Sequence, residues 1–127
     1  MIMPEITQKI LSTIKENKIS SVEVSDAIGK QGVLQNIKSL NKNHFASGQV
    51  VYVPTWCNSN WNLHKEIQDI NSDCIVYVDP IDCSNRAPVG DIISHYLFTY
   101  KNINGLVING YVRDSHKLIK EKYPIWC

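Results

Sequence analysis

Residues 74–79 read Cys-Ile-Val-Tyr-Val-Asp, five apolar side chains followed by an aspartate. A short, continuous apolar run of this kind is typical of a strand that is buried on both faces of an α/β sheet. Pro80 and a loop predicted over residues 81–89 come next. The segment therefore predicts a central strand with Asp79 at its carboxyl end.

The segments on either side of this strand alternate between strand and helix patterns. Apolar residues at helical spacing, or cap signals such as Ser20 with Glu23 and Gly29, predict helices at residues 4–17, 20–28, 62–71, 90–100 and 115–122. Further strands are predicted at residues 49–53, ended by Pro54, at 105–112, and from 123. Such alternation indicates an α/β fold, and 127 residues correspond to a single domain, residues 1–127.

The composition excludes several classes of partner. Thirteen basic and twelve acidic residues leave a net charge of +1 without charged blocks, which argues against nucleic acid or an anionic membrane as a partner. No apolar run approaches the roughly 20 residues that span a bilayer, and no secretory signal is recognisable. The four cysteines are widely spaced, so we favour reduced thiols in a cytoplasmic protein over a disulfide framework.

Two predicted strand ends carry groups suited to chemistry. The loop after Asp79 leads to Gly90 and Asp91, where backbone amides at a predicted helix start can hold a carboxylate or phosphate. Arg113 offers a bidentate clamp for a carboxylate, and Asp114 offers oxygen ligands for a divalent cation. Together these groups suit a small oxo-acid. The alternative is that Arg113 and Asp114 form a surface ion pair that caps the next helix.

The stretches 90–91 and 105–114 (Gly-Leu-Val-Ile-Asn-Gly-Tyr-Val-Arg-Asp) resemble the signature of a known family. It contains the regulator of ribonuclease E activity A and the 4-hydroxy-4-methyl-2-oxoglutarate/4-carboxy-4-hydroxy-2-oxoadipate aldolases. Weaker similarity extends over residues 22–29, 48–55, 74–79 and 123–127. The resemblance implies an α/β domain of the swivelling β/β/α type that forms a trimer or a dimer of trimers, with sites between subunits.

The resemblance also implies a divalent-metal-dependent lyase. Such an enzyme releases pyruvate from a small 2-oxo acid, by aldol cleavage of 4-hydroxy-2-oxo acids or by decarboxylation of oxaloacetate. Carried over by position, Arg113 would bind the pyruvyl carboxylate, Asp114 would hold Mg²⁺ or Mn²⁺, and Asp91 would orient a metal-bound water. The remaining substrate-binding positions, in the preceding loop, would be Ala87, Pro88, Val89 and Gly90.

The sequence departs from the family pattern in three places. Between Asp91 and Arg113 it has one residue more than the aldolases have, which we expect in the turn at residues 100–104. Lys117 occupies a position that is acidic in the aldolases, although not in the ribonuclease regulator. The sequence also ends at Cys127, where family members continue for several strands, so we expect a homo-oligomer or a complementing chain. The alternative to a lyase is a non-catalytic binding or regulatory protein.

Overall fold

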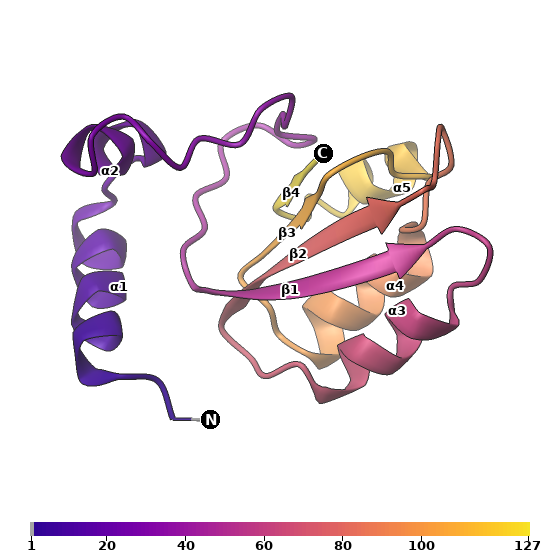
Figure 1. Cartoon of the computed structure of the whole chain (residues 1–127), viewed down its shortest axis with the longest axis horizontal. Helices are drawn as coiled ribbons and strands as arrows, with labels where there is room; N and C mark the ends of the chain where they lie inside the picture. The colour runs from indigo at the N-terminus through magenta and orange to yellow at the C-terminus, as the bar shows by residue number, and fades with distance from the viewer. Residues whose placement is uncertain (1) are drawn as a thin grey trace. The chain divides into compact units, whose positions relative to one another are not determined.

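The computed structural model describes residues 2–127, which form two compact units, Met1–Asn36 and Ile37–Cys127 (Figure 1). Our expectation of one domain over residues 1–127 stays a prediction. The smaller unit contains two helices, α1 (Glu5–Asn17) and α2 (Ser21–Ala27). The predicted capping box of α2 is confirmed: Ser20 Oγ accepts a hydrogen bond from the Glu23 amide at 3.3 Å, and the Ser20 amide donates to Glu23 Oε2 at 2.8 Å.

The larger unit is built on a sheet of four parallel strands in the order β1-β2-β3-β4. The strands are β1 (Gln49–Trp56), β2 (Cys74–Ile81), β3 (Gly105–Ile108) and β4 (Ile125–Trp126). The connections contain α3 (Trp61–Glu66) with the 3-10 turn η1 (Ile67–Asp69), α4 (Asp91–His95) with the π-helical η2 (Tyr96–Tyr100), and α5 (Ser115–Lys120). The predicted α/β class is thus confirmed.

The order of the strands decides which face of the sheet is covered. Parallel strands that follow one another in both chain and sheet are joined by right-handed crossovers, which place their helices on one face. Figure 1 shows α3 and α4 together beneath the sheet. Side chains on the helix side, such as Val76 and Val78, are fully buried, whereas Ile75 and Tyr77 remain partly exposed. The prediction that β2 is buried on both faces is therefore wrong.

Two predicted strand ends also differ from the structure. We predicted that Pro54 ends the first strand, but β1 continues to Trp56. Because β1 lies at the edge of the sheet, a residue without an N–H group is tolerated there. The strand predicted to reach Val112 ends at Ile108, and Val112 instead forms a separate parallel bridge with Val89.

The helix after Gly90 changes its winding halfway along. Its second half is a π turn, in which the Lys101 amide donates to the Tyr96 carbonyl at 3.2 Å, five residues back. A π turn holds one residue more than an α turn. The location of the extra residue that we expected in the turn at 100–104 stays a prediction. Ile93 and Leu97 of this helix face the core, whereas Ile92 is 79% exposed.

Candidate active site

The loop that follows β2 and the segment that follows β3 run side by side. Val89 and Val112 form their parallel bridge here, and the Arg113 amide donates a 3.0 Å hydrogen bond to the Val89 carbonyl. This pairing brings Gly90 and Asp91 next to Arg113 and Asp114. The two pairs of residues singled out from the sequence therefore meet in one place.

Gly90 is the contact point of this cluster. It is buried, and a Cβ atom at this position would lie 2.6 Å from Arg113 Cγ, 2.8 Å from Arg113 Nε and 2.8 Å from Asp114 Oδ2. The backbone of Gly90 is extended (φ −143°, ψ −159°), a conformation that any residue adopts. Glycine is required here because of space, since Arg113 and Asp114 both pack against its Cα.

The carboxylate of Asp114 faces the start of α4. Its Oδ2 accepts a hydrogen bond from the Asp91 amide at 3.3 Å, and its backbone is left-handed (φ 58°). Asp114 is the N-cap residue of α5, but its side chain makes no capping hydrogen bond to that helix. The alternative prediction, an Arg113–Asp114 ion pair that caps α5, therefore has no support in the contacts of this carboxylate.

Lys117 adds a second positive charge to the cluster. Its Nζ lies 3.6 Å from Asp91 Oδ2, and both side chains are partly exposed, so solvent screens the pair. The cluster then contains two carboxylates, one guanidinium and one ammonium group. Such a set can bind an anion through Arg113 and a cation through the carboxylates.

The donor set is compatible with Mg²⁺ or Mn²⁺ but does not form a complete cage. No group of three or more His, Cys, Asp or Glu side chains among residues 2–127 is arranged to hold a metal ion. Mg²⁺ usually keeps several waters and takes only one or two carboxylates from the protein. Asp114 fits this requirement, because only its Oδ2 is engaged by the Asp91 amide within the described chain.

The loop positions predicted to bind substrate through their amides are not equivalent. Pro88 is buried and has no N–H group, so it cannot donate a hydrogen bond and contributes only shape. Val89 is also buried, and its carbonyl is taken by Arg113. Ala87 is half-buried and, unlike Pro88, retains its amide.

Asp79 belongs to a hydrogen-bonded group on the sheet rather than to the loop. It lies within β2, where its Oδ2 accepts from the Tyr52 hydroxyl at 2.8 Å and its Oδ1 accepts from Asn109 Nδ2 at 3.2 Å. The hydrogen bond to Asp79 raises the pKa of Tyr52. Tyr52 also stacks on Tyr77, with ring centroids 6.1 Å apart. No local sequence pattern predicts this group, because only the register of the parallel strands brings its members together.

The structure pairs two of the four cysteines. Cys57 and Cys83 form a disulfide with their Cα atoms 5.0 Å apart, so the interpretation of all four cysteines as reduced thiols is wrong for this pair. The reason is the register, in which Trp56 at the end of β1 lies opposite Ile81 of β2. Cys74 is buried as predicted, and burial raises its pKa.

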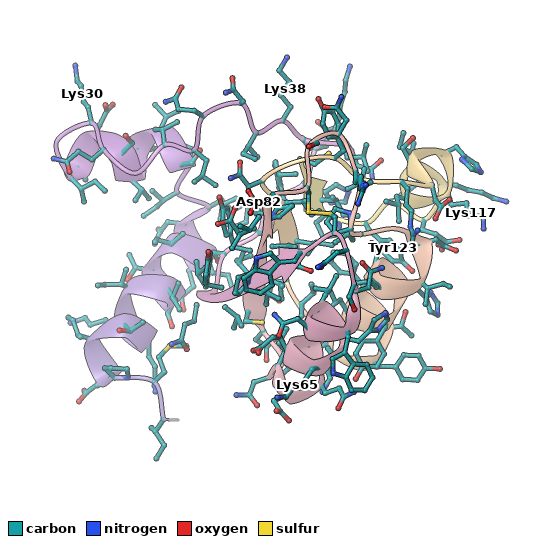
Figure 2. All side chains as sticks on the ribbon, turned by 45° about the vertical axis from the view of Figure 1, so that its right-hand side comes forward. Lys30, Lys38, Lys65, Asp82, Lys117 and Tyr123 are labelled. Atoms are coloured by element: carbon teal, nitrogen blue, oxygen red, sulfur yellow. A yellow bond between two sulfur atoms is a disulfide. The ribbon has the colours of Figure 1, made fainter. Side chains whose placement is uncertain are left out.

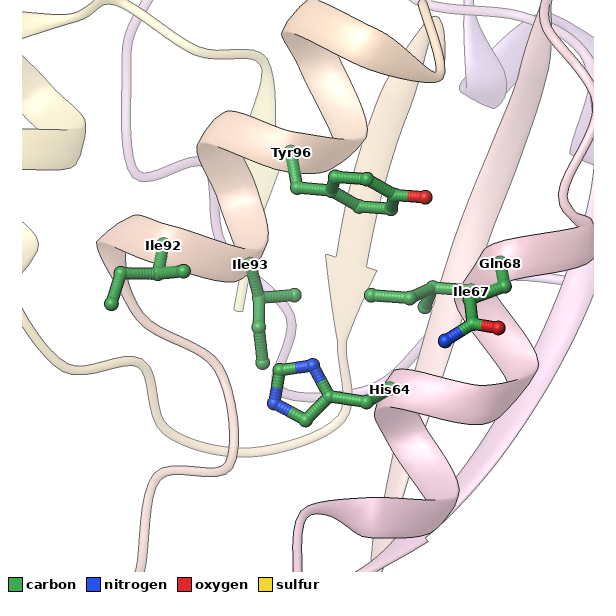
Figure 3. A pocket seen from close by; sticks show the side chains of 6 residues that line it. All are labelled: His64, Ile67, Gln68, Ile92, Ile93 and Tyr96. Atoms are coloured by element: carbon green, nitrogen blue, oxygen red, sulfur yellow. The ribbon is translucent and has the colours of Figure 1, made fainter.

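A shallow cavity of about 230 Å³ lies between α3 and α4 (Figure 3). Its lining is His64, Ile67, Gln68, Ile92, Ile93 and Tyr96. None of the predicted site residues lines it. The cavity is therefore separate from the cluster around Gly90.

Comparison with known proteins identifies the family. The family model described as RraA-like, Aldolase/RraA, matches residues 21–127. The chain belongs to the RraA-like family. The signature that we recognised in residues 90–91 and 105–114 lies inside the matched region.

Two similar proteins place this RraA-like chain among longer relatives. Protein DlpA of Legionella pneumophila is 27% identical over 136 residues, an alignment that covers 98% of this chain and 20% of DlpA. The crystal structure of Streptomyces coelicolor RraAS2, described as an unusual member of the RNase ES inhibitor RraA protein family, matches with a TM-score of 0.74 and 18% identity. That match covers all of this chain and 64% of RraAS2, and it supports the fold.

No helix within residues 2–127 of this RraA-like chain combines the length and apolar character needed to cross a membrane.

Proposed function

We propose that this RraA-like protein is a divalent-metal-dependent carbon–carbon lyase that releases pyruvate from a small 2-oxo acid. The observation that carries the proposal is the convergence of Asp91, Arg113 and Asp114 on Gly90. A carboxylate clamp and oxygen donors for a cation then stand together at the carboxyl ends of parallel strands, where α/β proteins bind ligands.

Arg113 would bind the carboxylate of the substrate. Its side chain is exposed, while its amide is fixed to Val89 and its aliphatic part lies against Gly90. A guanidinium group forms two parallel hydrogen bonds with a carboxylate, which orients the 2-oxo group as well as binding it. Because Arg113 and Asp114 both lie against Gly90, a 2-oxo acid held by Arg113 would lie beside the carboxylate of Asp114.

Asp114 would hold Mg²⁺ or Mn²⁺, which when bound polarises the 2-oxo group and stabilises enolate charge. Asp91 would act as the general base and then as the general acid of the reaction. In aldol cleavage its carboxylate takes the proton of the 4-hydroxyl group through a water, the bond between C3 and C4 breaks, and the proton is returned to C3 of the enolate. Lys117 keeps Asp91 in place by its contact with Oδ2.

The test is pyruvate release, followed with lactate dehydrogenase and NADH. Oxaloacetate and 4-hydroxy-2-oxo acids would be offered with Mg²⁺ or Mn²⁺, and in parallel with EDTA. We expect metal-dependent release by the wild type and by Lys120→Ala, a control that removes an exposed positive charge from α5. Release that persists unchanged in Arg113→Ala would contradict the proposal.

A second candidate is a non-catalytic binding or regulatory protein. The observation in its favour is the contact between Lys117 and Asp91, because the ammonium group engages the carboxylate that the lyase would need for proton transfer. RraAS2 is described as a member of a family of RNase ES inhibitors. Inhibition of an RNase E-type endonuclease, without pyruvate release from any 2-oxo acid, would favour this candidate.

We further propose that the protein acts as a homo-oligomer, a trimer or hexamer, or with a complementing chain. Large apolar side chains on the sheet face without helices, Val50 and Tyr52 among them, are more than half exposed. Apolar area of this kind is commonly covered by another protein surface. Light scattering that finds a monomer without a partner would contradict this.

A further inference from the structure

The disulfide joins the two loops that follow the carboxyl ends of β1 and β2. Trp56 pairs with Ile81 in the register of β1 and β2, and the cysteines follow one and two residues later. Figure 2 shows the bond between the sulfur atoms in yellow, near the labelled Asp82. Cys83 is also the second residue of the loop 82–90, which ends in the candidate site. The disulfide is therefore attached to the segment that leads into the site.

The loop 82–90 is anchored at both ends. At its far end, Val89 accepts the hydrogen bond from Arg113, and Gly90 packs against the same side chain. At its near end the anchor is Cys83, which is only 4% exposed and whose carbonyl accepts a 3.0 Å hydrogen bond from the Arg86 amide. One of the two anchors is thus a bond that thiols can break.

The backbone at the near end depends on that anchor. Asp82 and Ser84, the two neighbours of Cys83, both have left-handed conformations, with φ of 53° and 51°. Residues with a side chain avoid this region, and both of these side chains are exposed, so no core packing holds them there. The disulfide therefore holds the loop at a residue whose two neighbours are in a conformation that side chains disfavour.

We propose that Cys57 and Cys83 form a reversible redox lock that orders the loop 82–90 and so controls anion binding beside Arg113. The lock itself rests on the loop geometry, whereas its effect on a ligand rests on the proposed function. Disulfides that small thiols can reach are the labile, regulatory ones, and Cys57 is only half-buried. A pair of cysteines on a ligand-binding loop fits such a role.

The chemistry is thiol–disulfide exchange with a small thiol of the glutathione type. A thiolate of this compound attacks the Cys57 sulfur, the less buried of the two residues, and the bond between the protein sulfurs breaks. Cys83 leaves as a thiolate and takes up a proton. A second small thiol attacks the mixed disulfide, so that two thiols are oxidised to one disulfide and the protein disulfide is reduced to two thiols. The reverse reaction uses the small disulfide as oxidant.

The experiment compares the 127-residue chain in buffer with oxidised glutathione and in buffer with dithiothreitol. Peptide mapping after thiol alkylation identifies the linked cysteines, and hydrogen–deuterium exchange measures the order of residues 82–90. Calorimetry with oxalate and Mn²⁺ then measures anion binding. Cys127→Ala, which removes a thiol outside the pair, is the matched control and should respond as the wild type does. Cys57→Ser cannot form the disulfide and should behave as the reduced wild type does. If circular dichroism shows that this variant is unfolded, the wild type in dithiothreitol serves in its place.

We expect faster exchange in residues 82–90 after reduction. If the loop then adopts the binding conformation about a tenth of the time, oxalate affinity falls about tenfold. Alkylation of Cys57 and Cys83 under oxidising conditions, or equal exchange in both states, would overturn the lock. Faster exchange after reduction with no oxalate binding in either state would support the lock and count against the proposed lyase site.

Discussion

Replacing Gly90 by alanine tests the geometry of the site directly. The added Cβ would lie 2.6 Å from Arg113 Cγ, whereas two carbon atoms in contact are about 3.5–4.0 Å apart. Arg113 must therefore move by roughly 1 Å, and Asp114 Oδ2, 2.8 Å from the new atom, must move as well. A displacement of about 1 Å in a group that positions substrate costs about a hundredfold in rate. The added methyl group destabilises the fold by about 1–3 kcal/mol, because Arg113 Cγ lies close to the backbone and cannot move away freely.

The assay is kcat/KM for pyruvate release, together with the melting temperature and oxalate affinity. Gly110→Ala is the matched control, because a Cβ there lies 3.4 Å from Pro80 Cγ, an ordinary contact. We expect a loss of activity and of oxalate binding in Gly90→Ala that is much larger than in Gly110→Ala, with both proteins folded. Equal activity and oxalate affinity in the two variants would refute the argument that Gly90 sets the position of Arg113.

Three further predictions concern single residues. Arg113→Lys should lose almost as much activity as Arg113→Ala, because an ammonium group cannot form the two parallel hydrogen bonds of a guanidinium. A lost carboxylate pair costs roughly 2–5 kcal/mol, which corresponds to about a thirtyfold to several-thousandfold loss of activity. Near-wild-type turnover of the lysine variant would reject the clamp. Asp114→Ala should abolish Mn²⁺ binding in calorimetric titration while the melting temperature stays close to that of the wild type, and unchanged affinity would mean that Asp114 is not the metal ligand. Because its hydrogen bond to Asp79 raises the pKa of Tyr52, the neutral phenol favours the folded state. This stabilisation is complete below the ordinary tyrosine pKa and is lost as the pH rises through the raised pKa. Asp79→Asn, which removes the charged acceptor, should therefore lower the pKa of Tyr52 in a titration followed by absorbance at 295 nm. An unchanged pKa would contradict the assignment.

Local sequence patterns predicted the elements of the fold well, because caps and apolar spacing act over a few residues. The capping box of α2 was found this way, whereas Gly90 and Arg113 were singled out because both were predicted to lie near strand ends. The predictions were wrong where the order or the register of the strands determines which side chains are buried or in contact. A buried strand and a strand covered on one face have the same apolar run, so the partial exposure of Tyr77 depends on the order of the sheet.

Contacts between residues that are distant in the sequence could not be predicted from local patterns either. The bond between Cys57 and Cys83 spans 26 positions in the chain and requires the exact register of β1 and β2. The contact of Asn109 with Asp79 depends in the same way on β3 lying beside β2. Within the site, residue type suggested a clamp at Arg113 and a cation ligand at Asp114 but left a surface ion pair as the alternative, and the role of Asp91 came only from the family resemblance.

The sequential order of the strands has a consequence for how the larger unit is made. Each parallel pair joins strands that are neighbours in the chain, so no strand has to wait for a distant segment before it finds its partner. Domains fold as units while the chain leaves the ribosome from its N-terminus, and short sequence separation between contacting segments speeds folding. In the order of synthesis, β2 can pair with β1 once α3 has formed, and β3 can then pair with β2. The site, whose parts follow β2 and β3, can then form once these two strands have paired and before β4 is added.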